Sequence, residues 1–171
     1  MAIAAVYQST FSNLVVKKSI TTDASNETAV VPLFTVTGSV YIPRLYGVVT
    51  TTLGANQTAA YWRTNDQTAQ VSISLSSGTT VSSMGIGSVL TRHSVAAVAL
   101  KADNSTAAKV IDPVAATAPD VFMPFVVTQK VGGVLTQIEY VYSTTTEPTT
   151  GAIDFYVSWI PMTENSVLVS A

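Results

Sequence analysis

Hydrophobic and polar residues alternate most regularly between positions 121 and 161, where three strands are predicted in succession. Gly132 and Gly133 separate the first strand from the second, and glycines tolerate the positive φ angles that a tight hairpin turn requires. A polar loop containing Pro148 separates the second strand from the third. The pattern therefore predicts a three-strand antiparallel meander, with strands at 121–131, 134–143 and 152–160.

A two-residue turn also fixes a register for this meander, because it places Val131 opposite Val134. If the second hairpin closes symmetrically, alternate residues of all three strands share one buried face, where cross-strand pairs contribute about 0.2–1 kcal/mol each. Glu139 and Asp154 would then share the opposite, polar face, and Pro124 would mark a free edge of the first strand. The predicted sheet core consists of Phe125, Val127, Ile138, Tyr140, Phe155, Val157 and Trp159.

The rest of the chain also reads as short strands, separated by turn signals every 8–12 residues or so. No helix of ordinary length and no solenoid or propeller repeat is apparent. We therefore expect an all-β fold, an antiparallel β-sandwich that is either jelly-roll-like or immunoglobulin-like. Residues 31–171 are expected to form this single domain, and residues 1–30 an extended N-terminal arm with Lys17 and Lys18 in a loop. The arm is either a flexible leader or a segment that lies on a neighbouring subunit.

Composition narrows the classes of partner. Of the 171 residues, 47% are hydrophobic and only 11% are charged, against about 25% in an ordinary soluble domain. This indicates that much of the surface is sheet face or is covered by other subunits. A net charge of −2 argues against nucleic acid as a partner, because phosphate binding needs a basic patch. No apolar run reaches the length of a membrane helix and no signal peptide is recognisable, so we expect a protein made in the cytoplasm without a membrane partner.

The chain offers few groups for catalysis. His93 is the single histidine, cysteine is absent and the carboxylates are scattered along the sequence. The absence of cysteine excludes a cysteine nucleophile. A single histidine and scattered carboxylates are too few for a catalytic triad or a histidine-based zinc site. The Gly85–Gly87 fragment lacks the third glycine of a dinucleotide fingerprint. We expect no enzyme activity, no metal and no cofactor.

Other side chains are better candidates for contact with neighbouring proteins. Arginines donate strong, geometrically defined hydrogen bonds across interfaces. Aromatic residues near predicted strand ends, such as Tyr61 and Trp62 beside Arg63, would either pack in the core or line a carbohydrate-binding surface. The candidate contacts with other subunits are Tyr7, Phe11, Lys17, Lys18, Arg44, Arg63 and Arg92.

Two stretches add a resemblance to a known class. Leu33–Gly38 (LFTVTG), followed by Leu45–Thr51 (LYGVVTT), resembles the opening of a compact β-domain in small structural proteins of tailed bacteriophages, and Ser74–Ser82 is similar in style. The resemblance implies a virion protein, most like a capsid decoration (cement) protein. Such proteins are often β-sandwich or jelly-roll trimers that sit on the head and clamp neighbouring capsid subunits. It supplies no catalytic residues.

Together these observations lead to an expectation for function. We expect a non-enzymatic virion protein on the capsid surface, with the major capsid protein and further copies of itself, as a homotrimer, for partners. The alternative is a tail or fibre component with a carbohydrate-binding surface.

Overall fold

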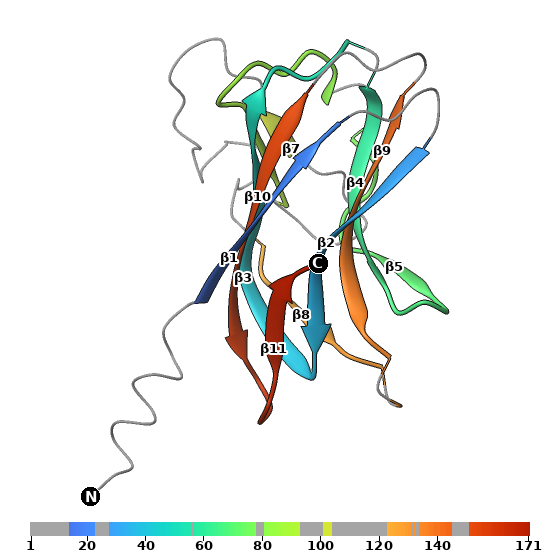
Figure 1. Cartoon of the computed structure of the whole chain (residues 1–171), viewed down its shortest axis with the longest axis vertical. Helices are drawn as coiled ribbons and strands as arrows, with labels where there is room; N and C mark the ends of the chain where they lie inside the picture. The colour runs from blue at the N-terminus through green and yellow to red at the C-terminus, as the bar shows by residue number, and fades with distance from the viewer. Residues whose placement is uncertain are drawn as a thin grey trace, which may run out of the picture.

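The computed structural model describes residues 14–22, 28–55, 57–77, 81–92, 101–103, 123–130, 132, 134–144 and 151–171. Within these ranges the chain forms eleven strands in two antiparallel sheets that pack face to face (Figure 1). Sheet A has the order β1 (Leu14–Thr21), β10 (Ala152–Pro161), β3 (Ser39–Thr51), β6 (Val89–Thr91) and β7 (Lys101–Asp103), with β8 (Phe125–Thr128) also paired to β3. Sheet B has the order β11 (Val167–Ser170), β2 (Thr28–Thr37), β9 (Thr136–Thr144), β4 (Gln57–Asn65) and β5 (Gln70–Ser72). The prediction of an all-β sandwich is confirmed.

The strand order distinguishes between the two sandwich types. Strands β1 to β4 alternate between sheet A and sheet B, and so do β8, β9 and β10. The paired sets are therefore β1-β10-β3-β8 and β2-β9-β4-β5, which is the strand order of a jelly roll. An immunoglobulin-like sandwich would keep several pairs of consecutive strands within one sheet. The β6-β7 hairpin and β11 are additions to the jelly-roll frame.

The predicted meander over 121–161 is wrong. Strand β8 pairs with β3, β9 lies between β2 and β4 in sheet B, and β10 lies between β1 and β3 in sheet A. Both connections cross from one sheet to the other instead of closing a hairpin. Alternation specifies which residues of a strand face inward, but it does not specify the neighbouring strand.

The core lies between the inward faces of the two sheets. Tyr140 and Phe155 come from opposite sheets, and their ring centroids are 4.8 Å apart. Trp62 packs edge-on against Phe155 at 6.2 Å. Gly47 on β3 makes room for Phe155, because a Cβ atom there would lie 2.7 Å from the ring. Of the residues proposed for the sheet core, Phe125 is partly buried and the others are buried, namely Val127, Ile138, Tyr140, Phe155, Val157 and Trp159.

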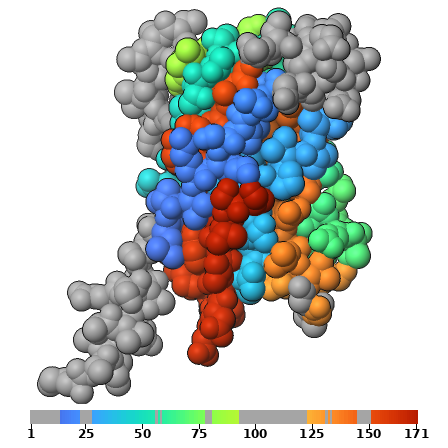
Figure 2. Space-filling view, viewed as in Figure 1, coloured from blue at the N-terminus to red at the C-terminus, as the bar shows by residue number. Residues whose placement is uncertain are grey.

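The N-terminal region contributes a strand to the sandwich. Residues 14–21 form β1, which pairs with β10 along its whole length, so the expectation of a loop at Lys17 and Lys18 was wrong. The side chains alternate: Ile20 is buried, whereas Lys17 and Ser19 are exposed. Figure 2 shows β1, in blue, against β11, in red, where the two strands lie side by side on the surface. Tyr7, Phe11 and His93 lie outside the described residues.

Candidate functional site

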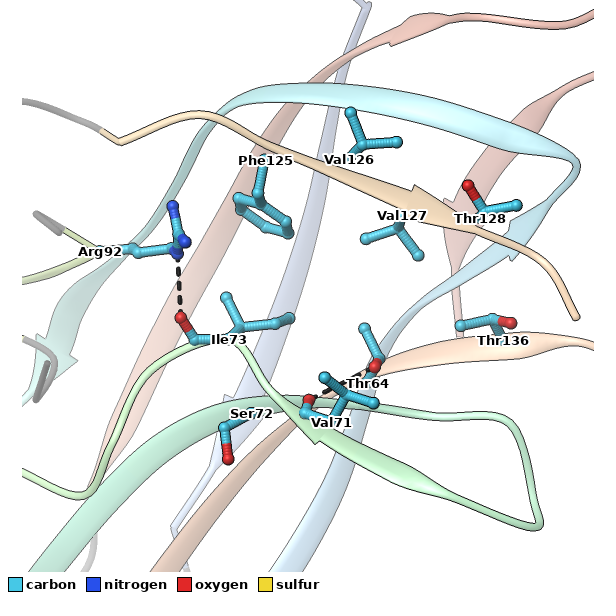
Figure 3. A pocket seen from close by; sticks show the side chains of 10 residues that line it. All are labelled: Thr64, Val71, Ser72, Ile73, Arg92, Phe125, Val126, Val127, Thr128 and Thr136. Atoms are coloured by element: carbon cyan, nitrogen blue, oxygen red, sulfur yellow. Dashed lines mark hydrogen bonds between the residues drawn. The ribbon is translucent and has the colours of Figure 1, made fainter. Parts of the chain in front are cut away.

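A groove opens where two short edge strands of different sheets face each other (Figure 3). Among the described residues, β5 pairs only with β4, and β8 pairs only with β3. The cavity between them has a volume of about 290 Å³ and continues into a second hollow of about 260 Å³. Both are lined by Thr64, Val71, Thr128 and Thr136. We call this continuous depression the edge groove.

One end of the edge groove is occupied by Arg92. Its Nε donates to the carbonyl oxygen of Ile73 at 2.9 Å, and its Nη1 donates to the carbonyl oxygen of Met123 at 2.6 Å. The guanidinium lies 4.8 Å from the centre of the Phe125 ring. Burial lowers the pKa of Arg92, and no carboxylate of the described residues meets it. The cation therefore bridges the two sheets through backbone carbonyls, within its own chain.

The other end of the groove is bridged by Lys130, which follows β8. Its Nζ lies 3.6 Å from Oδ2 of Asp66 and donates to the hydroxyl of Thr68, both in the turn between β4 and β5. The Thr68 hydroxyl and the backbone N–H groups of Thr68 and Ala69 donate to Asp66 and lower its pKa to about 2. Two cations thus span the opening, one at each end of β8.

Thr136 supplies a polar group without a partner. Its side chain lines both hollows and is only 4% exposed, and its hydroxyl makes no hydrogen bond with the described residues. A buried hydroxyl in this state costs about 1–3 kcal/mol. The floor of the groove therefore has unused hydrogen-bonding capacity beside apolar side chains, chiefly Ile73, Phe125 and Val127.

The backbone of β8 also has peptide N–H and C=O groups that pair with no strand of the described residues. The N–H of Gln129 donates to the carbonyl of Gly38 at 2.7 Å. Because hydrogen-bonded and non-hydrogen-bonded pairs alternate in an antiparallel ladder, Val127 is bonded to β3 whereas Val126 and Thr128 direct their N–H and C=O groups away from it. Among the residues that the structure describes, β8 thus has a free edge, and Pro124, which the sequence associated with such an edge, immediately precedes it.

The same reasoning applies to β5. The N–H of Asp66 donates to the carbonyl of Ala69 at 3.1 Å, and the N–H of Ile73 donates to the carbonyl of Trp62 at 2.9 Å. The intervening residues Gln70 and Ser72 therefore direct their peptide groups away from β4. Unpaired peptide groups of two strands flank the groove.

Arg63, a second candidate contact, is bound within its own chain. Its Nε donates to Oε2 of Glu139 at 2.6 Å, and its Nη1 donates to Oε1 of Gln70 at 2.6 Å. Oε1 of Glu139 also accepts from Asn65 at 2.8 Å. This partly buried network lies on the outer face of sheet B, whereas Asp154 lies on the outer face of sheet A. The prediction that Glu139 and Asp154 share one face was therefore wrong.

The remaining candidate contacts lie on β1 and β3. Lys17 Nζ lies 2.6 Å from Oδ2 of Asp154, and this hydrogen bond raises the pKa of Lys17. Burial acts to raise the pKa of Asp154, but hydrogen bonds from Lys17 and Ser19 outweigh it, and the pKa is lowered. Lys18 donates to the carbonyl oxygen of Ala171, and Arg44 is exposed on β3.

Aromatic residues do not form the exposed sugar-binding surface that Tyr61, Trp62 and Arg63 suggested. Trp62 is fully buried in the core. On the outer face of sheet A, Tyr46 and Tyr156 stack with ring centroids 5.1 Å apart, and Lys17 lies over the Tyr156 ring. Each of these rings therefore has a face covered by a neighbour.

The described residues contain neither a metal-binding cluster nor a membrane-spanning helix. Within the described ranges, no group of three His, Asp or Glu side chains could hold a metal ion. The described residues also contain no helix long and apolar enough to cross a membrane. Comparison with protein-family models, with curated proteins and with solved structures finds no match to this chain.

The edge groove itself was missed by the sequence reasoning. Arg92 and Thr136 lie on different sheets and far apart in the chain, and no local pattern joins them. The one available signal was Pro124, which indicated an edge strand without naming its neighbours.

Proposed function

We propose that this chain is a non-enzymatic structural protein of a virus particle, which binds the outside of a phage capsid lattice and stabilises it through protein–protein contacts. The observation that carries the proposal is the pair of unsealed strand edges at the groove. Val71 and Val126 at its rim are 63% and 51% exposed. Unpaired sheet edges with exposed apolar side chains are typical of surfaces that other chains cover.

The fold and the resemblance support the same proposal. Jelly rolls occur in viral capsid proteins and in lectins, although a fold alone does not define a function. The segments that resemble phage proteins, Leu33–Gly38 and Leu45–Thr51, belong mainly to β2 and β3 and contribute buried residues such as Phe34 and Leu45. Their resemblance therefore concerns the core of the domain.

Stabilisation would arise by mass action. A protein that binds the assembled lattice, but not its loosened form, shifts the equilibrium toward the intact shell. The proposed assembly is a homotrimer on the capsid surface, with the major capsid protein as its partner.

The copy number of this chain in purified virus particles tests the proposal. Quantitative mass spectrometry would measure it relative to the major capsid protein. A number close to that of the capsid subunit, or a simple fraction of it, supports a decoration protein spread over the lattice. A few copies per particle would contradict the proposal and favour a tail or fibre component, to be tested on a glycan array, and the absence of the chain would overturn both.

A further inference from the structure

We infer that the edge groove binds an extended segment from a second copy of this chain, residues 1–13, which adds as a strand to the free edge of β8. The inference rests on the proposed function in one respect: the proposed function includes self-association, and the inference specifies how the copies associate. Addition of a strand to an exposed sheet edge is a common mode of peptide recognition.

The chemistry of the groove suits an extended backbone. Val126 and Thr128 offer two N–H and two C=O groups to a new neighbour, in the alternation that an antiparallel strand requires. Thr136 adds a hydroxyl without a partner in the described structure. Arg92 already binds carbonyl oxygens of Ile73, Met123 and Pro124, so a carbonyl of the incoming strand is a matched acceptor for its remaining N–H groups. Apolar side chains of the strand would cover Phe125 and Val127.

Residues 1–13 have the composition for this role. The segment contains no charged side chain and no proline, and it carries apolar side chains at Ile3, Val6, Tyr7 and Phe11. Proline would remove donors from a strand, and a buried charge without a partner would be costly. The segments 104–122 and 145–150 contain both proline and charged residues, and 93–100 is held at both ends by the paired strands β6 and β7. Residues 1–13, in contrast, contain neither a proline nor a charged side chain and lead directly into β1 at Leu14.

Strand order indicates that the segment comes from another copy. Leu14 begins β1, which lies at the opposite edge of sheet A from β8, three strand spacings away, or about 14 Å. An antiparallel neighbour of β8 would run in the same direction as β1, because β1 and β3 are both antiparallel to β10. To bind the groove of its own chain, the segment would therefore have to cross sheet A. The chain would then have to return along the length of the strands to reach Leu14 at the start of β1. A second copy avoids this return, and the resulting head-to-tail contact can close into a ring such as a trimer.

Disulfide trapping tests the inference directly, because none of the 171 residues of the chain is a cysteine. Copies carrying Val6→Cys would be mixed with copies carrying Thr128→Cys under mild oxidation. Because the register of the added strand against β8 is not fixed in advance, single cysteines would also be placed at each position from 3 to 9. The matched control is Ile86→Cys, which is 66% exposed on a turn that does not line the groove. We expect disulfide-linked dimers with Thr128→Cys to form at least about tenfold faster than with the control, because docking raises the effective concentration of the two thiols.

The doubly substituted chain separates the two sources of the segment. If the segment comes from a second copy, the chain with both cysteines forms covalent oligomers on non-reducing gels. A disulfide confined to single chains, or equal rates for Thr128→Cys and Ile86→Cys, would overturn the inference. Neither result would bear on the copy number in virus particles, so failure here is distinguishable from failure of the proposed function.

Proline at the free edge gives a second test. Val126→Pro removes an N–H that points away from β3 and leaves the bonds to β3 in place. Val126→Ala is the matched control, because it shortens the same side chain and keeps the N–H. We expect Val126→Pro to weaken self-association about fivefold to tenfold relative to Val126→Ala, as expected for the loss of one hydrogen bond. Analytical ultracentrifugation measures this, and equal association of the two variants would contradict strand addition at β8.

Discussion

The edge of the sandwich formed by β1 and β11 is closed, whereas the edge formed by β5 and β8 contains a groove. At the closed edge, β1 pairs with β10 over eight residues, Lys18 donates to the carbonyl of Ala171, and Leu168 is buried between the sheets. At the open edge, β5 and β8 have three and four residues, and the bridging side chains of Arg92 and Lys130 stand at either end.

The difference shows that one sandwich can have a well-packed edge and an edge at which strand pairing stops among the described residues. Sheets of a sandwich lie about 10 Å apart, and inward side chains fill that space only where strands run along both sides. Strand β11, which is additional to the jelly-roll frame, completes this at the closed edge. The short strands of the open edge leave peptide groups unpaired, and short edge strands limit uncontrolled pairing with other chains. Within the described ranges, no further strand pairs with β5 or β8 at this edge.

The largest effect is expected at the bridge of the open edge. Replacing Arg92 with Met should lower the free energy of unfolding by about 3 kcal/mol, because it leaves buried carbonyls without a charged donor. Urea denaturation with an unchanged m-value would measure this loss. Arg92→Lys keeps the charge but cannot bind the same carbonyl oxygens together. Its free energy of unfolding should therefore lie between those of the wild type and Arg92→Met. Wild-type stability for Arg92→Met would mean that the guanidinium does not hold this edge.

The closed edge should respond through its apolar packing. Leu168→Ala is expected to cost about 2 kcal/mol, at the low end of the usual range because a site near the edge can partly collapse. Val169→Ala on the same strand is the control, since its side chain is 49% exposed and should change stability by less than about 0.5 kcal/mol. Equal effects of the two substitutions would show that β11 does not close the core.

A third substitution acts in the opposite direction. Thr136→Val keeps the shape of the side chain and removes the hydroxyl without a partner, so the isolated chain should gain about 1 kcal/mol of stability. Ser74→Ala is the control, because Ser74 Oγ is also buried but accepts from the backbone N–H of Trp62 at 3.1 Å, and its loss should destabilise. Destabilisation by both would mean that the Thr136 hydroxyl is already satisfied.

The sequence predicted which residues face the core better than it predicted which strands are neighbours in a sheet. Tyr140 and Phe155 were expected to lie on one buried face of a single sheet, and their rings do meet, but across the core between two sheets. The reason is that period-two alternation is the same for a hairpin and for a pair of facing sheets. Only the connections at 129–135 and 145–151 decide between the two, and the glycines and polar residues found there are compatible with either.

Local sequence patterns could not predict the groove, for a related reason. Its floor and rim come from β4, β5, β8 and β9, and its bridging side chains come from the ends of β6 and β8. Arginines were singled out as donors to other subunits, whereas Arg63 and Arg92 donate within the chain, to Glu139 and to carbonyl oxygens. Which acceptor an arginine meets depends on strand order, and strand order was the part that alternation could not supply.

The smallest effect is expected from pH at the turn before β5. Hydrogen bonds from Thr68 and Ala69 lower the pKa of Asp66 to about 2, below its ordinary value of 3.8. Ionised Asp66 therefore contributes stability above pH 3.8, and this contribution is lost as the pH falls through about 2, together with the contact to Lys130. Asp66→Asn keeps acceptors for the same N–H groups and should lose less stability than wild type between pH 4 and about 2, which acid unfolding followed by tryptophan fluorescence would show. An NMR titration that placed the Asp66 pKa at its ordinary value would mean that Thr68 and Ala69 do not stabilise the ionised carboxylate.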